Sequence, residues 1–431
     1  MLCNETIEED QLRKYRRKLL VFLSVASFFE GYDFIALTQL LPELRENFSL
    51  SRTEGGLLIG FINIGTIAAY GIVRQADRVG RKQVLAFTIA GYAILTGLSG
   101  LAPNAIVFGT LQLMSRAFMI AEWVTSLVIA AEEFPANRRG TVVGTIQACA
   151  SLGSIVCAGI IPTLKSLAPA AGPGFLWLPE GTDYRFRVVY FIGVIPLFAL
   201  AYARRNLKET RRFRAIKSDE PAPQRSLLHI FRTRHRKRVL QLGLIWTTSY
   251  LCMQNGVAFF KDYAMTEAGL TDTQVADAVK IAALVSMPFV FYVSRLLDAL
   301  GRRPSAAIIF GTGAFGILIA YQSTHLPTLT LALVLGVFAS SASNHVLNTY
   351  TTELFPTELR ADAFAWSNNV LGRIGYVGSP ILVGYLADQF DSWGLVLTTT
   401  AVFPLITIWL IYWLLPETKH MPLEETEKLG V

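Results

Sequence analysis

The sequence predicts an all-α membrane protein in which twelve transmembrane helices form two pseudo-symmetric six-helix bundles. Of its 431 residues, 52% are hydrophobic and only 16% are charged, which is too few charges to cover the surface of a soluble protein of this length. The apolar residues fall into about twelve blocks of roughly 20 residues, the length at which an α-helix crosses the hydrocarbon core of a membrane. The third observation is an internal repeat.

The repeat consists of two charged segments that recur at one offset. Residues 77–81, Asp-Arg-Val-Gly-Arg, return 221 positions later as Asp298, Gly301 and Arg302. The same offset carries Glu-Glu-Phe-Pro and a following Arg in 132–139 onto Glu-Leu-Phe-Pro and a following Arg in 353–360. Repetition of two motifs at one offset indicates two related halves.

The elements follow from the apolar blocks. An arm, 1–18, precedes the first bundle, 19–204; a linker, 205–238, leads to the second bundle, 239–415, and a tail, 416–431, follows it. Residues 19–26 also fit the apolar core of a cleaved signal peptide, but their block continues to residue 41, so an uncleaved first span is the simpler interpretation. The predicted spans are 19–41, 54–75, 83–102, 105–131, 141–164, 187–204, 239–264, 275–296, 304–323, 328–350, 363–387 and 393–415.

Charge sets the predicted orientation. Short cytoplasmic loops collect Lys and Arg, and most of the 39 basic residues fall on one side if both termini are cytoplasmic. Residues 204–238 alone hold thirteen of them. A basic stretch between membrane spans indicates contact with anionic lipid headgroups rather than with nucleic acid. Asn47, in the first outer loop, fits the glycosylation pattern.

Ionisable residues inside the first-half spans are candidate functional groups, because such residues are costly in a membrane. The first span carries Glu30 and Asp33 on either side of Tyr32. Asp33 lies near its middle, where desolvation favours a protonated carboxyl, as proton coupling requires. The fourth span carries Arg116 and Glu122, which point about 120° apart on a helix and therefore need partners on other spans.

Spans of the second half supply candidate substrate contacts. Arg373 is the best candidate for an anion contact, because a guanidinium binds a carboxylate through two hydrogen bonds. Polar residues share one face of span 10, which indicates either a cavity wall or hydrogen bonding between helices. The further candidates are Tyr250, Gln254 and Asn255 in span 7, Ser341, Asn344, His345 and Asn348 in span 10, and Trp366, Asn369 and Tyr376 in span 11, together with Tyr32 and Arg116 of the first half.

Enzyme and cofactor motifs are missing from the sequence. It contains no HExxH, GxSxG or P-loop motif, and no cysteine or histidine grouping of the kind that binds a metal. Residues 311–316 fit GxGxxG, but the βαβ context of a dinucleotide site is absent, so these glycines indicate close helix packing. We therefore predict no catalytic residues, no metal and no cofactor.

With two six-span halves, a repeated Asp-x-x-Gly-Arg loop and a repeated Glu-x-Phe-Pro loop, the sequence resembles the major facilitator superfamily over essentially its whole length. This resemblance implies alternating access, with spans 1, 4, 7 and 10 around a central cavity and Arg116 paired with Asp33 or Glu30. It also implies that the repeated loops form a cytoplasmic gate through ion pairs across the bundles. The gate residues would be Asp77, Arg78, Gly80, Arg81, Glu132, Arg139, Asp298, Gly301, Arg302, Glu353 and Arg360.

Residues 30–33, Glu-Gly-Tyr-Asp, are similar to the Asp-Gly-x-Asp of aromatic-acid/proton symporters in that superfamily, with Glu in the first position. Span 5 lacks the Gly-Pro and paired glycines of drug/proton antiporters, which favours uptake. We therefore predict proton-coupled symport of a small organic anion, such as an aromatic or other carboxylate, by a monomer in the cell membrane. Asp33 would load the proton, with Glu122 and Glu30 assisting. Two alternatives stay open: a facilitator or exporter of a neutral or cationic metabolite or drug, and a non-transporting receptor or scaffold.

Overall fold

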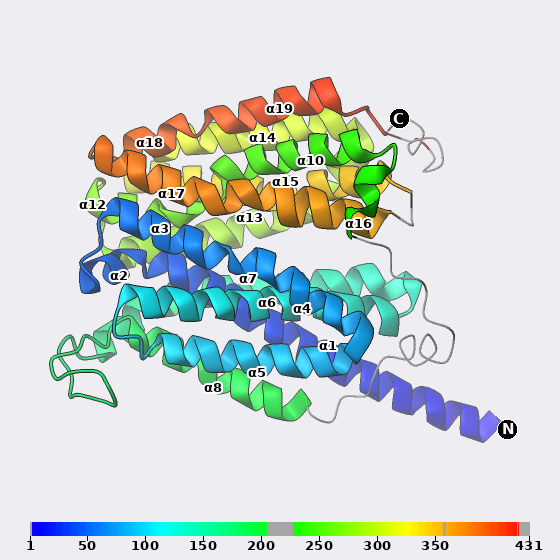
Figure 1. The fold of residues 1–431 in the computed structure, drawn as a ribbon, viewed down its shortest axis with the longest axis horizontal. Coiled ribbons are helices and arrows are strands. Elements are labelled where there is room, and N and C mark those ends of the chain that lie inside the picture. Colours follow the sequence, from blue (N-terminus) through cyan, green and yellow to red (C-terminus); the bar gives the residue numbers. More distant parts are fainter. Residues whose placement is uncertain (1, 205–226, 357–358, 420, 422–431) are drawn as a thin grey trace. The chain divides into compact units, whose positions relative to one another are not determined.

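The structure is a computed structural model that describes residues 2–204, 227–356, 359–419 and 421 (Figure 1). The chain divides into two compact units, one comprising Met1–Leu37 with Ala68–Pro223 and the other Thr38–Ile67 with Gln224–Val431. We call them unit 1 and unit 2. The boundary does not follow the sequence repeat, because residues 38–67 of the first half pack into unit 2.

Unit 1 is built from long helices that pack along one another. Its described helices are α1 (Leu2–Gln39, whose last two residues belong to unit 2), α4 (Gly65–Val79), α5 (Arg81–Ser99), α6 (Ala105–Glu133), α7 (Ala136–Leu167) and α8 (Arg187–Arg204). Helices α1 and α7 meet at glycines: a Cβ atom on Gly31 would lie 1.9 Å from the carbonyl oxygen of Ala150, and one on Gly153 would lie 1.8 Å from that of Phe28. Only glycine allows such backbone contact, and it fixes the part of α1 that carries Glu30 and Asp33.

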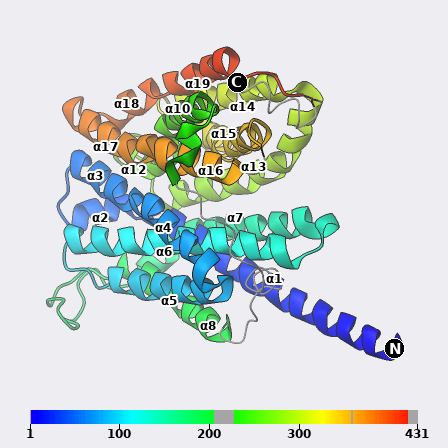
Figure 2. The ribbon, with the colours of Figure 1, turned by 45° about the vertical axis from the view of Figure 1, so that its right-hand side comes forward.

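Unit 2 combines the second half of the sequence with α2 (Leu41–Asn47) and α3 (Arg52–Asn63). In two views these helices lie beside α12 and α17 (Figures 1 and 2). The other described helices are η1 (Leu227–Arg232), α10 (Arg236–Met253), α11 (Asn255–Ala258), α12 (Phe260–Thr266), α13 (Asp272–Leu300), α14 (Arg302–Ala320), α15 (Leu326–Glu353), α16 (Arg360–Phe364), the π-helix η2 (Ala365–Gly372), α17 (Arg373–Gln389), α18 (Trp393–Thr399) and α19 (Val402–Leu414).

Every predicted span coincides with helix. In the described part of the chain, nine helical stretches are long and apolar enough to cross a membrane, and each overlaps a predicted span. The other three predicted spans, 83–102, 187–204 and 239–264, lie in α5, in α8 and in the broken run α10 to α12. Helix α1 also extends through the predicted arm, because its charged residues are good helix formers.

Local sequence signals explain several helix ends. The Ser51 hydroxyl accepts the backbone N–H of Glu54 while the Glu54 carboxylate accepts that of Ser51, and Thr271 and Gln274 form the same capping box at α13. The two repeated glycines stand where α5 and α14 begin, at φ 121° for Gly80 and 102° for Gly301. A residue with a side chain adopts these angles only under strain, which accounts for glycine in both copies.

Candidate functional site

Buried ionisable residues gather in unit 1. Glu30 and Asp33 on α1 and Arg116 and Glu122 on α6 are each at most 6% exposed. All four interact electrostatically with the buried Tyr92 of α5, so the cluster draws on three helices. The Tyr92 hydroxyl donates a hydrogen bond of 3.1 Å to the carbonyl oxygen of Phe29, one residue before Glu30. The structure therefore brings together the four ionisable residues that the sequence singled out.

Within this cluster, Arg116 has a cation–π contact and forms no direct ion pair with the residues that the structure describes. Its guanidinium lies 5.2 Å from the ring centroid of Phe34 and attracts the Asp33 carboxylate electrostatically. The Arg116 Nε has no hydrogen-bond partner among the described residues. Glu122 accepts a hydrogen bond of 3.0 Å from the hydroxyl of Ser126, one turn along α6. The predicted roles of these residues in proton coupling stay predictions.

Tyr32 lies beside the cluster but points to α8. Its hydroxyl donates to the carbonyl oxygen of Val189 at 3.3 Å, and its ring packs against Gly193. With Asp33, Tyr92 and Tyr190 it surrounds a gap in unit 1 that is too small for a water molecule. These contacts hold α1 to α8, and a substrate contact for Tyr32 stays a prediction.

In unit 2, Arg373 lies between two aromatic rings. Its guanidinium is 4.5 Å from the ring centroid of Tyr376 and 5.2 Å from that of Tyr250, and such cation–π contacts stabilise a cation in a poorly solvated place. The Arg373 Nε has no hydrogen-bond partner in the described part of the chain. Tyr250 in turn stacks on Trp246, with ring centroids 5.5 Å apart. The arginine is therefore fixed in position while donor capacity is left for a ligand.

The π-helix η2 adds a residue that the sequence did not reveal. The Tyr250 hydroxyl donates to Asn368 Oδ1 at 3.0 Å, whereas the α-helical spacing of span 11 had selected Asn369. A π-helix forms i→i+5 hydrogen bonds and so adds a residue to the turn, and in this turn Asn368 rather than Asn369 meets the Tyr250 hydroxyl. Close contact with α10 supports this turn: Thr247 Oγ1 lies 2.9 Å from the Leu371 carbonyl oxygen, and a Cβ atom on Gly375 would lie 2.4 Å from that of Thr247.

The other predicted substrate contacts interact with residues of unit 2 other than Arg373. The Trp366 ring packs on Phe231 of η1 at 4.8 Å. Asn344 and His345 contact backbone carbonyls one turn earlier in α15, those of Ser340 and Ser341, and Asn255 of α11 donates to the Leu251 carbonyl oxygen of α10. Gln254, Asn369 and His345 are half-buried, and Asn344 and Asn348 are exposed. A place for them in the substrate site stays a prediction.

The repeated loops form matching ion pairs, one inside each unit. Arg81 pairs with Glu132 at 3.2 Å in unit 1, and Arg302 pairs with Glu353 at 2.6 Å in unit 2. Arg302 also lies 3.4 Å from Asp298, and Arg360 Nε donates to the Phe355 carbonyl oxygen. The side chains of Asp77, Arg78 and Arg139 lie outside the described residues. Each motif thus ties the ends of its own helices together, and a gate across the bundles stays a prediction.

The tail strengthens only the second copy of the loop. Glu417 accepts hydrogen bonds from the backbone N–H groups of Arg302, Arg303 and Lys419, and the Thr418 hydroxyl donates to Glu353. Burial raises the pKa of Glu417, but these backbone hydrogen bonds outweigh it and hold the pKa below its usual value. The one sequence signal for this cap is an acidic residue that closely follows an apolar block.

We expect Glu417→Gln to lower the melting temperature at pH 7 by about 2 °C, because the helix start loses a charged acceptor. Because the pKa of Glu417 is lower in the folded protein than in the unfolded chain, this carboxylate stabilises the fold at pH values above the ordinary carboxyl pKa of about 4.3. That stabilisation is lost as the pH falls through the pKa of Glu417 in the folded protein. The difference from the parent should therefore shrink below about pH 4. Glu180→Gln, in an exposed loop, is the control, and an equal loss in both variants would contradict the cap.

Comparison with known proteins agrees with this architecture. The family model of the Major Facilitator Superfamily matches residues 23–262 and 242–430. The chain is 27% identical to a probable 4-methylmuconolactone transporter of Cupriavidus pinatubonensis, over 92% of this chain and 89% of the relative. It is also 27% identical to a cis,cis-muconate transport protein of Acinetobacter baylyi, over 85% and 87% of the two chains, and 23% identical to a gallate transporter of Pseudomonas putida, over 88% and 87%.

Solved structures show the same fold. A D-xylose–proton symporter superposes with a TM-score of 0.72 at 17% identity, covering 94% of this chain and 99% of its own. A bacterial homologue of the lysosomal transporter Spinster, inward-facing and occupied, gives 0.73 at 16% identity, covering 92% and 96%. These relatives are transporters and not enzymes. With a family model that covers nearly the whole chain, this multi-pass membrane protein belongs to the Major Facilitator Superfamily.

Proposed function

We propose that the protein takes up a small organic anion, such as an aromatic or other carboxylate, by proton-coupled symport and alternating access. The proposal that the substrate is an anion depends on Arg373. Two tyrosine rings hold its guanidinium in place, and its Nε has no hydrogen-bond partner among the described residues. In this proposal the carrier is a monomer of the cell membrane with cytoplasmic termini, and the proton gradient replaces any cofactor.

The chemistry around Arg373 fits a carboxylate attached to a flat, apolar body. A guanidinium binds a carboxylate through charge-assisted hydrogen bonds, and the rings of Tyr250 and Tyr376 offer faces against which a conjugated or aromatic group can pack. Two of the relatives are named for muconate and gallate, which are carboxylates of this kind. Asn368 supports the arrangement, because its side-chain oxygen holds the Tyr250 hydroxyl.

The chemistry in unit 1 fits proton coupling. Three carboxyl groups, on Glu30, Asp33 and Glu122, share a buried region with the single guanidinium of Arg116. Ionised carboxylates that share a buried region repel one another, so each additional negative charge there is disfavoured. Binding a proton relieves that cost, so protonation can bias a conformational equilibrium of the carrier. We assign proton loading to Asp33, which the Arg116 guanidinium attracts while it is ionised.

The experiment that tests this function is a thermal-shift screen of the purified protein against carboxylates, amines and sugars at pH 5.5 and pH 7.5. A carboxylate that stabilises the protein, more at the lower pH, is the expected result, because ligand and proton would favour the same state. Stabilisation by amines alone would support a cation carrier. Stabilisation by sugars alone would support a facilitator of neutral metabolites, and either result would overturn the anion proposal.

Asn368→Leu should weaken binding of the carboxylate found in that screen by about fivefold, because the lost hydrogen bond is worth about 1 kcal/mol and Tyr250 is left free to move. Asn369→Leu is the matched control on the next residue and should change binding by less than about twofold. Titration of both variants with that carboxylate decides the matter. A larger loss in the Asn369 variant would mean that the α-helical spacing, not the π-helix, describes the site.

A further inference from the structure

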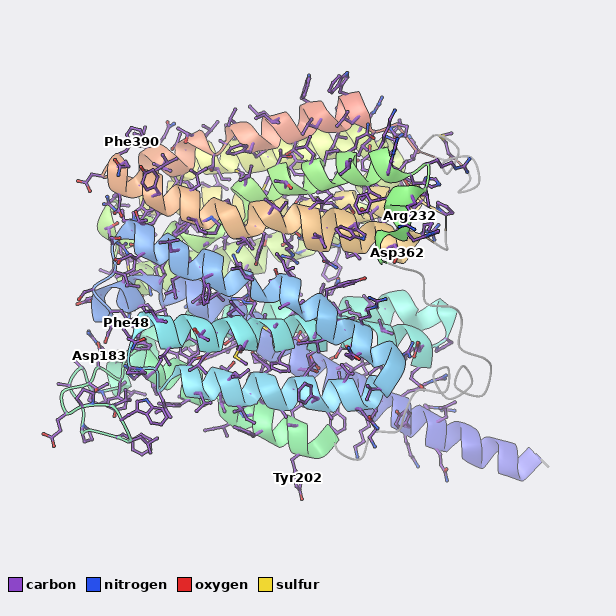
Figure 3. The ribbon with its side chains drawn as sticks, viewed as in Figure 1. Phe48, Asp183, Tyr202, Arg232, Asp362 and Phe390 are labelled. Carbon is purple, nitrogen blue, oxygen red and sulfur yellow. The ribbon has the colours of Figure 1, made fainter. Side chains whose placement is uncertain are left out.

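The connection between α7 and α8, residues 168–186, is a folded loop of unit 1. Figure 3 shows Asp183 where this loop returns to α8 and Tyr202 toward the opposite end of that helix. In two views the loop projects beyond the ends of α5 and α8 (Figures 1 and 2). With both termini predicted to be cytoplasmic, the segment between predicted spans 5 and 6 is outside. The loop is therefore expected at the outer surface of the membrane.

The second half of the sequence manages without such a loop. The connection at the corresponding place, from α17 to α18, consists of residues 390–392 only. The longer loop is thus a feature of one half that the repeated architecture does not require. Ordered loops of this length usually have a function, and none of the residues proposed for substrate or proton binding lies in this one.

Hydrogen bonds fasten the base of the loop to unit 1. Gly172 and Thr182 form an antiparallel bridge, which begins a short hairpin. The buried Arg187, at the start of α8, donates to the carbonyl oxygens of Gly100 and Ala102 in the connection between α5 and α6. The hairpin is therefore held at a fixed place beside the ends of these helices.

The tip of the hairpin exposes three apolar side chains. Phe175 and Leu178 form a second bridge, and the two residues between them make the turn. Phe175, Leu176 and Trp177, which we call the apolar tip, are 55%, 67% and 56% exposed, whereas Leu178 is buried. Trp177 Nε1 donates to the Leu101 carbonyl oxygen at 2.7 Å. The indole N–H is thus satisfied while much of its ring stays uncovered.

Leu176 has a backbone conformation that leucine rarely adopts. Its φ is 55°, in the left-handed region where a side chain is strained. Glycine is the usual residue where the first position of a two-residue hairpin turn has a positive φ. A leucine at this place, with its side chain exposed, indicates that the side chain has a role.

The chemistry of the segment fits lipid better than a protein partner. Residues 167–179 contain no charged residue and, apart from the Trp177 indole, no polar side chain. Three of them are prolines, which have no N–H, and the N–H groups of Gly172, Phe175 and Leu178 are bonded within the hairpin, which reduces the number of backbone donors that need water. A protein interface surrounds its apolar centre with polar groups, whereas exposed tryptophan among apolar residues is typical of the membrane–water interface.

The apolar tip also continues an apolar surface of unit 1. Leu167, at the end of α7, is 78% exposed, and Ile106, at the start of α6, is 81% exposed. Both helices are long and apolar enough to cross a membrane. The Trp177 indole is bonded to Leu101, in the same short connection that leads to Ile106. Lipid that covers these helix ends therefore extends to the apolar tip.

We propose that the hairpin of residues 172–182 is an interfacial anchor, whose apolar tip inserts between the phospholipid headgroups of the outer leaflet and reaches the upper acyl chains. The hydrogen bonds at its base and at Trp177 connect it to the ends of α5, α6 and α8, so the anchor fixes the depth of unit 1 in the membrane. The proposal requires only that the chain spans a membrane, which family membership shows, and it is independent of the substrate and of proton coupling.

The test uses a fluorophore on the apolar tip and two quenchers. Leu176→Cys is labelled with bimane in a chain that also carries Cys3→Ser and Cys149→Ser, since the other cysteines, Cys157 and Cys252, are buried. The full chain is placed in phosphatidylcholine nanodiscs, whose two faces are both open to water. Iodide quenches a label that water reaches, and lipid brominated on the upper acyl chain quenches a label inside the membrane.

The quantity compared is the ratio of quenching by brominated lipid to quenching by iodide. We expect this ratio to be about tenfold higher at position 176 than in Glu180→Cys, because an interfacial anchor lies about 5–10 Å deep in the boundary between headgroups and acyl chains. Glu180 is the matched control, since it is an exposed, charged residue of the same hairpin. Equal ratios at the two positions, or protection of position 176 from both quenchers, would overturn the anchor.

Two variants of Phe175 separate insertion of the apolar tip from simple closeness to lipid. In the chain labelled at position 176, Phe175→Asp should lower the ratio by about fivefold, because a carboxylate is disfavoured outside water, and Phe175→Leu should keep it within about twofold. Phe175 is exposed, so neither change disturbs a packed core, and the melting temperature of each variant in detergent verifies this. An unchanged ratio in Phe175→Asp would also overturn the anchor. Carboxylate binding enters none of these measurements, so failure of the proposed substrate would leave them unchanged.

Discussion

Arg373→Ala is expected to weaken binding of the transported carboxylate by about 100-fold, because charge-assisted hydrogen bonds to an ion contribute about 1.5–3 kcal/mol and 1.4 kcal/mol is a tenfold change. Arg373→Lys should recover only part of this loss, since an ammonium group cannot reproduce the two parallel hydrogen bonds of a guanidinium. The measurement is a titration of purified protein, followed by uptake into proteoliposomes.

The chain offers a matched control for this variant. Arg295 on α13 also lies over a tyrosine ring, 5.4 Å from the centroid of Tyr292, but it is exposed. Arg295→Ala removes an equal charge and one cation–π contact, and this variant should bind the carboxylate as the parent does. If both variants lose affinity equally, the effect is one of overall charge. If neither does, Arg373 is not the anion contact.

Asp33→Asn is expected to abolish accumulation of substrate driven by a pH gradient, while binding stays within about threefold of the parent. An amide cannot carry the proton, yet it preserves the shape of the side chain and its hydrogen-bonding capacity. Proteoliposomes with an acidic exterior should show uptake together with alkalinisation of that exterior for the parent, and neither for the variant. Exchange of labelled for unlabelled substrate, which needs no net proton movement, should persist.

Asp277→Asn is the control for this second variant, because Asp277 is an exposed carboxylate paired with Lys280 on the same helix. It should accumulate substrate as the parent does. Full accumulation by Asp33→Asn would remove Asp33 from the coupling step and direct the same test to Glu122 and Glu30, the other two buried carboxylates of the cluster. Loss of both exchange and accumulation would instead mean that Asp33 is needed for conformational change as such.

The sequence predicted the helices and the membrane class well because both depend on local properties. Apolar length marks each span, and the repeat marks the two halves. The sequence also identified the ionisable residues of unit 1, since a charge in an apolar block is conspicuous whatever it contacts. Their shared interaction with Tyr92 could not be predicted, because the sequence does not show whether a tyrosine in a span faces lipid or charged side chains.

Other features depend on packing between distant segments. The Asn368 contact was missed because α-helical spacing cannot register a π-helix, although polar Ser367, Asn368 and Asn369 in an apolar block were a signal. Lys261 and Asp262 were missed although they lie in predicted span 7, where the cost of intramembrane charge applies equally. Their ion-pair partners Glu43 and Arg45 fall between the first two predicted spans, in what the structure shows to be the short helix α2, and nothing in that segment indicates which distant helix it meets.

The π-helix has a consequence for all of α17, which follows it directly. One additional residue per turn acts like a single-residue insertion, which rotates everything downstream by about 100° relative to an uninterrupted α-helix. Arg373 and Gly384 both lie downstream of it, so the direction of the proposed anion contact and the face that meets α3 are set by the same eight residues, 365–372. The position of the Arg373 guanidinium and the contact between α17 and α3 therefore depend on the same helical turn.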